Sequence, residues 1–166
     1  MAITLRAVGT GAHSASGNVA PGLPSGWQAG DLHICIAGSR STAEPTMDGN
    51  WTELDPGNRN VTVFYSKSWY RIAQAGDSDP TVTNGGTSIL DAIIIGYYGC
   101  SPSTPIDVLG SIDVTPSATP QKTINFPAIT TTHANTKVLC IGVYRGGSAT
   151  VSGYSGSPTP TEEIDY

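Results

Sequence analysis

Histidines and serines are the residues from which a nucleophilic active site could be assembled in this sequence. His13 and His133 lie in polar stretches, whereas His33 lies inside an apolar run. A serine hydrolase brings a Ser, a His and a carboxylate into contact, and one sequence sign of such an enzyme is a Gly-x-Ser-x-Gly turn. The sequence has no such turn. We therefore expect solvated or core histidines and predict no catalytic residue.

Acidic residues suggest two further kinds of site. Asp77 and Asp79 stand in one Gly/Asp/Pro-rich turn, but calcium takes about 6–8 oxygen ligands and nothing nearby completes the set. Asp side chains that cap backbone N–H groups are the favoured interpretation. A glycoside hydrolase would need two carboxyl groups across a cleft. The candidates for that pair are Glu44, Asp48, Glu53 and Asp55. Scattered loop carboxylates are usually solvated, so we expect no enzyme, no metal and no cofactor.

Aromatic residues at turns are candidates for stacking on a sugar ring. Trp27 and Tyr154 follow glycines, and Trp51 follows a Gly-Asn pair. Aromatic rings bury a large area, and a corner tryptophan more often fills a sandwich core than a binding site. Carbohydrate stacking by Trp51, Trp27 or Tyr154 is therefore kept as the alternative interpretation.

The elements that would position these residues are β-strands. Residues 60–74 alternate two sets of β-branched and aromatic side chains, with Trp69 on one face and Tyr70 on the other. The breaker cluster at 75–80 predicts a turn into a returning strand at 81–83. Further strands are predicted at residues 2–8, 32–37, 51–54, 87–98, 106–114, 122–126 and 137–144. Those at 32–37 and 137–144 are apolar enough to be central strands, and residues 93–95 predict a strand covered on both faces.

Composition agrees with an all-β domain. The 166 residues include 20 Gly and 12 Pro, and only 13% are charged. We predict one antiparallel β-sandwich over residues 1–154, with extended termini and a Pro/Thr-rich tail at 155–166. The net charge of −5, without any basic run, argues against nucleic acid as a partner. Without a signal peptide or an apolar run of about 20 residues, we expect synthesis in a cytoplasm and no membrane contact.

The three cysteines give no sign of a metal site. No Cys-x-x-Cys spacing occurs, and the residues are far apart at Cys35, Cys100 and Cys140. Cys35 and Cys140 stand within predicted strands among aliphatic residues, which favours buried free thiols. A bridge between two strands is the alternative.

Several motifs together resemble those of a family of structural proteins of tailed bacteriophages. They are Gly-Trp-Gln-Ala-Gly-Asp-Leu at 26–32, Gly-Asn-Trp-Thr-Glu-Leu at 49–54, Trp-Tyr-Arg-Ile-Ala-Gln-Ala-Gly-Asp at 69–77 with Pro-Thr-Val-Thr at 80–83, and Ile-Gly-Tyr-Tyr-Gly-Cys-Ser-Pro-Ser-Thr-Pro-Ile-Asp at 95–107. The pattern spans about residues 20–154. Members of this family have a jelly-roll-like sandwich and look like head decoration (cement) proteins, or like modules of tail fibres and minor tail proteins. Family members continue through further strands beyond the position of residue 154, so we expect an exposed strand edge that invites pairing with another chain.

The resemblance implies a non-enzymatic virion protein, most concretely one that decorates the capsid. Its expected partners are the major capsid protein or other virion proteins, together with further copies of itself. The residues expected to make these contacts lie at the two ends of the chain: Met1, Ile3, Leu5, Pro158, Pro160, Ile164 and Tyr166. The alternative is a tail-fibre or baseplate module that recognises carbohydrate on the host surface.

Overall fold

The chain folds into antiparallel β-sheets, as the sequence predicts. The computed structural model describes residues 2–40, 43–54, 64–85, 88–110, 126 and 128–143. Its strands are β1 (Thr4–Val8), β2 (Ala12–Ser14), β3 (Leu32–Ser39), β4 (Pro45–Met47), β5 (Thr52–Glu53), β6 (Tyr65–Ile72), β7 (Val82–Asn84) and β8 (Leu90–Tyr98). Within these residues, no helix is long and apolar enough to cross a membrane.

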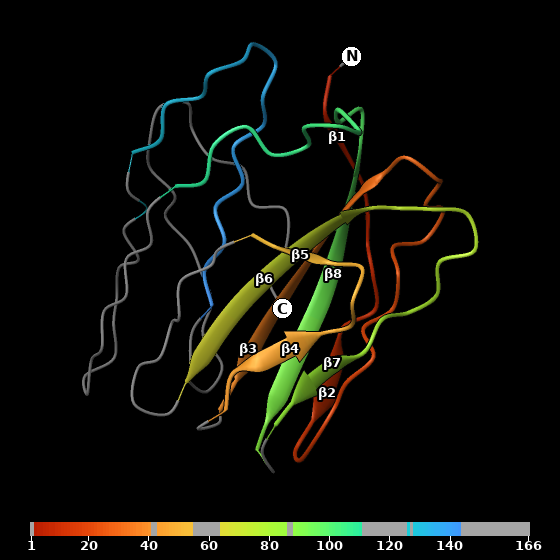
Figure 1. The fold of residues 1–166 in the computed structure, drawn as a ribbon, viewed down its shortest axis with the longest axis vertical. Coiled ribbons are helices and arrows are strands. Elements are labelled where there is room, and N and C mark those ends of the chain that lie inside the picture. The colour runs from red at the N-terminus through yellow and green to blue at the C-terminus, as the bar shows by residue number, and fades with distance from the viewer. Residues whose placement is uncertain are drawn as a thin grey trace.

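One large sheet and one small sheet form the two layers of the fold (Figure 1). The large sheet has the strand order β1-β8-β3-β6-β5, with β2 pairing the far end of β8, and the small sheet is the pair β4-β7. β3 lies between β8 and β6 in continuous antiparallel register, so its expected central position is confirmed. β1 pairs β8 with a bulge between Leu5 and Ala7, which interrupts an edge strand.

Both faces of the large sheet are apolar, and a different part of the chain packs on each. On the first face, Cys35, Trp69 and Ile94 form a core with Val82 of the small sheet. On the second face, Ile34 and Ile95 lead a cluster that also includes partly buried residues far along the chain. Those residues are Cys100, Ile106, Leu139 and Ile141. The alternation of β6 is confirmed, because Trp69 packs on the first face and Tyr70 on the second.

The returning strand after β6 takes a different path from the one expected. β7 does not pair with β6 but with β4, in the small sheet. The nine residues from 73 to 81 separate β6 from β7, whereas β-hairpin loops usually have about 2–5 residues. The turn therefore carries the chain across to the second layer.

The predicted strand at 137–144 is wrong over the described residues 137–143. These residues belong to no strand, although Leu139, Ile141 and Val143 are partly buried and the alternate residues Val138 and Cys140 are exposed. The predicted central position is also wrong, because only one side of this described segment is partly buried. A strand also needs a neighbour to complete its ladder, and none of the described strands pairs with these residues. The described residues 106–110 are likewise outside any strand.

The cysteines separate into different environments, and all three are free. Cys35 is fully buried in β3, as predicted, and burial raises the pKa of its thiol to about 12. Cys140 is exposed, so its predicted burial is wrong. It lies on the outward side of segment 137–143, a side that alternation alone does not identify.

Two isoleucines of one stretch test the importance of double-sided burial. Ile94 is fully buried in β8, whereas Ile89, just before β8, is 37% exposed. We predict that Ile94→Ala lowers the free energy of unfolding by about 2–5 kcal/mol, because a cavity is left in the core. Ile89→Ala, the matched control, should lower it by about 1 kcal/mol or less. Equal losses in urea unfolding of the two variants would contradict this assignment of the core.

Candidate functional site

Two identical turns close one end of the large sheet. The tetrapeptide Gln-Ala-Gly-Asp occurs at 28–31, just before β3, and again at 74–77, just after β6. In each turn the Asp N–H donates to the Gln carbonyl, at 3.0 and 3.1 Å, and the Gly has a positive φ, 96° and 87°. This is the geometry of a type II turn, in which the third position favours glycine. In each turn the Asp Oδ2 also accepts the Gln N–H, at 2.9 Å in both.

Each turn holds an arginine of a neighbouring strand. Arg6 Nε lies 2.5 Å from Asp31 Oδ2, and Arg71 Nη2 lies 2.7 Å from Asp77 Oδ1. Arg71 also lies over the ring of Trp51, with its guanidinium carbon 5.7 Å from the ring centroid. These side chains are mostly shielded from water, and a buried charge is tolerated only when it is paired. The carboxylates therefore fix both the turns and the guanidinium groups.

A groove of about 350 Å³ lies beside the second of these turns. Its lining residues are Asn50, Thr52, Tyr70, Arg71, Ile72, Gln74, Pro102, Ser103 and Pro105. β5, β6 and their flanking residues form one wall, because Thr52 is paired directly with Tyr70 and Ile72 follows on the same side of the strand. The loop that follows β8 forms the opposite wall.

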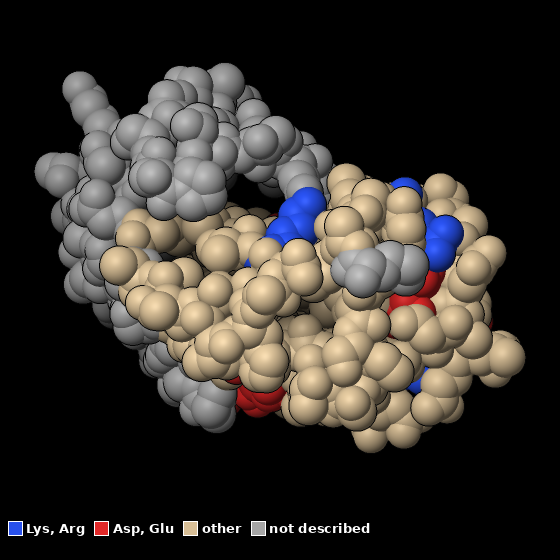
Figure 2. Space-filling model, turned by 90° about the horizontal axis from the view of Figure 1, so that it is seen from above, with Lys and Arg blue, Asp and Glu red and all other residues tan. Residues whose placement is uncertain are grey.

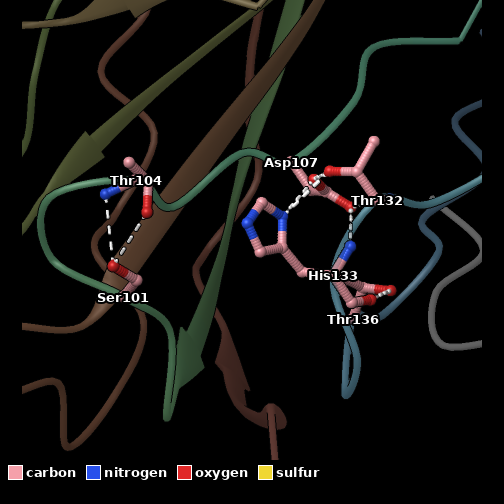
Figure 3. Close-up of polar contacts among 6 residues, drawn as sticks. All are labelled: Ser101, Thr104, Asp107, Thr132, His133 and Thr136. Carbon is pink, nitrogen blue, oxygen red and sulfur yellow. Dashed lines mark hydrogen bonds and ion pairs between the residues drawn. The ribbon is translucent and has the colours of Figure 1, made fainter.

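Hydrogen bonds fix that loop near both of its ends (Figure 3). Ser101 Oγ accepts the Thr104 N–H at 3.2 Å and lies 3.1 Å from Thr104 Oγ1. Asp107 Oδ2 accepts the N–H groups of Thr132 at 2.7 Å and His133 at 3.2 Å. The groove wall at residues 102–105 is thus tied to itself and to the segment that begins at residue 128.

Asp107, Thr132 and His133 resemble a catalytic triad in composition but not in geometry. Thr132 Oγ1 donates to Asp107 Oδ1, and His133 Nδ1 lies 2.7 Å from the same oxygen. The side-chain hydrogen bond from Thr132 and that from His133 lower the pKa of Asp107. In a triad the nucleophile contacts Nε2 while the acid holds Nδ1. Here Thr132 lies 2.9 Å from Nδ1, and no described hydroxyl bonds Nε2, so the cluster ties two loops together.

The structure brings two of the proposed glycosidase carboxylates together, but around a lysine. Glu44 Oε1 and Glu53 Oε2 lie 2.8 and 3.0 Å from Nζ of Lys67, whose side chain is 12% exposed. Burial acts to lower the pKa of Lys67, but the hydrogen bonds to Glu44 and Glu53 outweigh it and raise the pKa. The ammonium group contacts both carboxylates, so the pair does not flank an open cleft.

The acidic turn proposed for calcium is used for structural hydrogen bonds instead. Asp77 pairs with Arg71, and Asp79 Oδ1 accepts the Leu23 N–H at 2.8 Å. Within the described part of the chain, no group of three or more His, Cys, Asp or Glu residues could hold a metal ion.

Of the three candidates for sugar stacking, the two that the structure describes pack within the fold. Trp51 is partly buried, packs against the first core and lies under Arg71. Trp27 packs edge-on against His33, with ring centroids 5.8 Å apart. Tyr154 lies outside the described residues. The groove is nevertheless adjacent to Trp51, since Asn50 and Thr52 both line it.

The residues predicted to contact a partner are placed only in part. Ile3 and Leu5 pack partly against the second core cluster of their own domain. Met1, Pro158, Pro160, Ile164 and Tyr166, with the rest of the tail, lie outside the described residues. Their role as contacts stays a prediction.

The sequence interpretation missed Arg71, Gln74 and the loop at 101–107 as parts of one site. The repetition of Gln-Ala-Gly-Asp was the available signal for the paired turns. No comparable signal joins Asn50 to Ser103, because their proximity arises only from the packing of the loop on the sheet.

The surroundings of His33 at the end of the large sheet predict that stability depends on pH. The residue is fully buried, and neither ring nitrogen has a partner among the described residues. Burial lowers the pKa of His33 from its ordinary 6.5, partly opposed by the charges of Asp31 and Asp77. Below pH 6.5 the unfolded chain therefore binds more protons than the folded one, and stability falls as pH falls.

We predict that the free energy of unfolding decreases between pH 7 and pH 5, above the range in which carboxylates titrate. His33→Gln should flatten this decrease, whereas His13→Gln, at a side chain that is 59% exposed, should retain it. Urea unfolding at several pH values measures the slope. A parent protein equally stable at pH 7 and pH 5 would contradict the environment described for His33.

Comparisons with known proteins add no relative to these observations. No protein-family model, curated protein or solved structure matches the chain. The resemblance to phage structural proteins therefore stays a prediction based on the motifs quoted above. The function proposed below is therefore supported by those motifs and by the geometry of the described residues.

Proposed function

We propose that the chain is a non-enzymatic structural protein of a bacteriophage virion, most concretely a decoration protein that binds the lattice of the major capsid protein. The observation that carries this proposal is segment 137–143. Its side chains alternate between partly buried and exposed, Leu139 and Ile141 pack on the second face of the sheet, and within the described residues it belongs to no strand. An extended segment in this state can accept a strand from another chain.

The outward side of this segment is suited to contact with a protein. Val138 is 51% exposed and Cys140 is exposed beside it. Seen from above, most of the described surface consists of residues other than Lys, Arg, Asp and Glu (Figure 2). At one of the few charged places, basic and acidic side chains lie next to each other. Such a surface supports apolar and backbone contacts rather than electrostatic attraction to nucleic acid.

The physical role would be to add buried area across the joints between capsid subunits. A protein that binds the assembled shell but not free subunits stabilises the shell by mass action. Symmetric oligomers of the decoration protein would place several such contacts around one joint. The chain termini, including Ile3 and Leu5, remain the further contacts expected from the sequence.

Sedimentation with emptied capsids of the phage that encodes the chain tests this proposal. The protein should pellet with capsids and remain in solution without them. Val138→Glu should weaken the apparent affinity about tenfold or more, because a charge would enter the contact without a partner. Ile89→Glu is the control, since Ile89 is an exposed apolar residue in another part of the fold.

Failure of the parent protein to pellet with capsids would overturn the decoration proposal. Co-sedimentation that is equally strong in both variants would overturn the role of segment 137–143. Circular dichroism of each variant checks that the strands are retained.

A further inference from the structure

We propose that the groove between β5–β6 and the loop at 101–107 is a binding site for a neutral carbohydrate. The site does not depend on the virion assignment, and it differs from the stacking surface expected at Trp51, Trp27 and Tyr154. Its volume of about 350 Å³ accommodates one or two sugar rings, at the lower end of the range of small-molecule sites.

The lining offers the mixed chemistry that a sugar presents. Two side-chain amides, from Asn50 and Gln74, can each donate and accept hydrogen bonds. Hydroxyl groups from Thr52, Tyr70 and Ser103 add further donors and acceptors. Apolar surface comes from the Tyr70 ring, Ile72, Pro102 and Pro105, against which the C–H face of a pyranose ring can pack.

The charge of the groove favours a neutral ligand. Arg71 is the only charged residue among the described residues that line it, and Asp77 neutralises Arg71 at 2.7 Å. The described lining contains no carboxylate that would attract a cation. Arg71 Nε is buried and has no hydrogen-bond partner among the described residues.

The walls of the groove are fixed before a ligand arrives. Asp77 and the Trp51 ring hold Arg71, and the Asp77 carboxylate also accepts the Gln74 N–H. On the other side, the hydrogen bonds of Ser101 and Asp107 hold the loop that carries Ser103 (Figure 3). A site that is ordered in advance loses less conformational entropy on binding.

The repeated turn supplies a matched pair of variants. Gln74 lines the groove, whereas Gln28 occupies the equivalent position of the other turn and does not. Both side chains are exposed, and both residues make the structural hydrogen bond through the backbone N–H. Gln74→Ala and Gln28→Ala therefore alter the same turn chemistry, but only the first removes a groove amide.

Isothermal titration of the purified chain with maltohexaose, cellohexaose and chitohexaose as neutral probes tests the proposal. Hexagalacturonate serves as the acidic probe. We expect saturable binding of at least one neutral oligosaccharide, with a Kd in about the millimolar range or tighter. Gln74→Ala should weaken that binding about fivefold to tenfold, and Gln28→Ala should leave it unchanged.

If none of the neutral probes binds at about 10 mM, roughly ten times a millimolar Kd, the proposal is overturned. Binding of hexagalacturonate alone would overturn the assignment of a neutral ligand. Equal weakening in the two glutamine variants would overturn the groove as the site. Because capsids are absent from this experiment, its failure is separate from a failure of the decoration proposal.

Discussion

The burial of β3 and β8 on both faces is the constraint on which the rest of this structure depends. Ile34 and Ile95 face one side while Cys35 and Ile94 face the other, so one covering layer is not enough. The small sheet covers the first face with paired strands. Among the described residues, the second face is covered by the loop after β8 and by segment 137–143, neither of which contains a strand. This asymmetry is the reason why the proposed contact with a partner is placed on the second side.

Paired charges set the geometry at the ends and edges of the large sheet. The described strands contain three basic side chains, Arg6, Lys67 and Arg71, and each one contacts a carboxylate and lies over an aromatic ring. Leaving one of these partly buried cations unpaired would be unfavourable, so the acidic loops have little freedom of position. The same pairs that stabilise the fold therefore also order the residues along the groove.

Local pattern predicted much of the large sheet but not its assembly. Alternation identified the faces of β6, and the continuous apolar run at 93–95 identified a strand buried on both sides. Both properties depend on the side chains of one strand and on the period of two residues. The sequence did not predict that β7 joins β4 or that segment 137–143 stays outside the ladders, because pairing depends on which neighbours remain free.

The candidate site was predictable to a smaller degree. Asp77 and Asp79 were expected to cap a turn, and both do accept backbone N–H groups. Glu44 and Glu53 were considered as a pair, but the sequence interpretation did not identify Lys67 of β6, the strand paired with β5, as the residue between them. The groove likewise combines residues about fifty positions apart, and only the packed fold brings them together.

Amide hydrogen exchange at residues 138–142, measured with and without emptied capsids, tests the central claim most directly. The claim is that residues 138–142 pair with none of the described strands and gain ladder partners from the proposed partner. We predict fast exchange there in the free protein, slow exchange in β3 and β8 throughout, and new protection of the segment on capsid binding. Exchange as slow as that of β3 in the free protein, or no change in the presence of capsids, would contradict it.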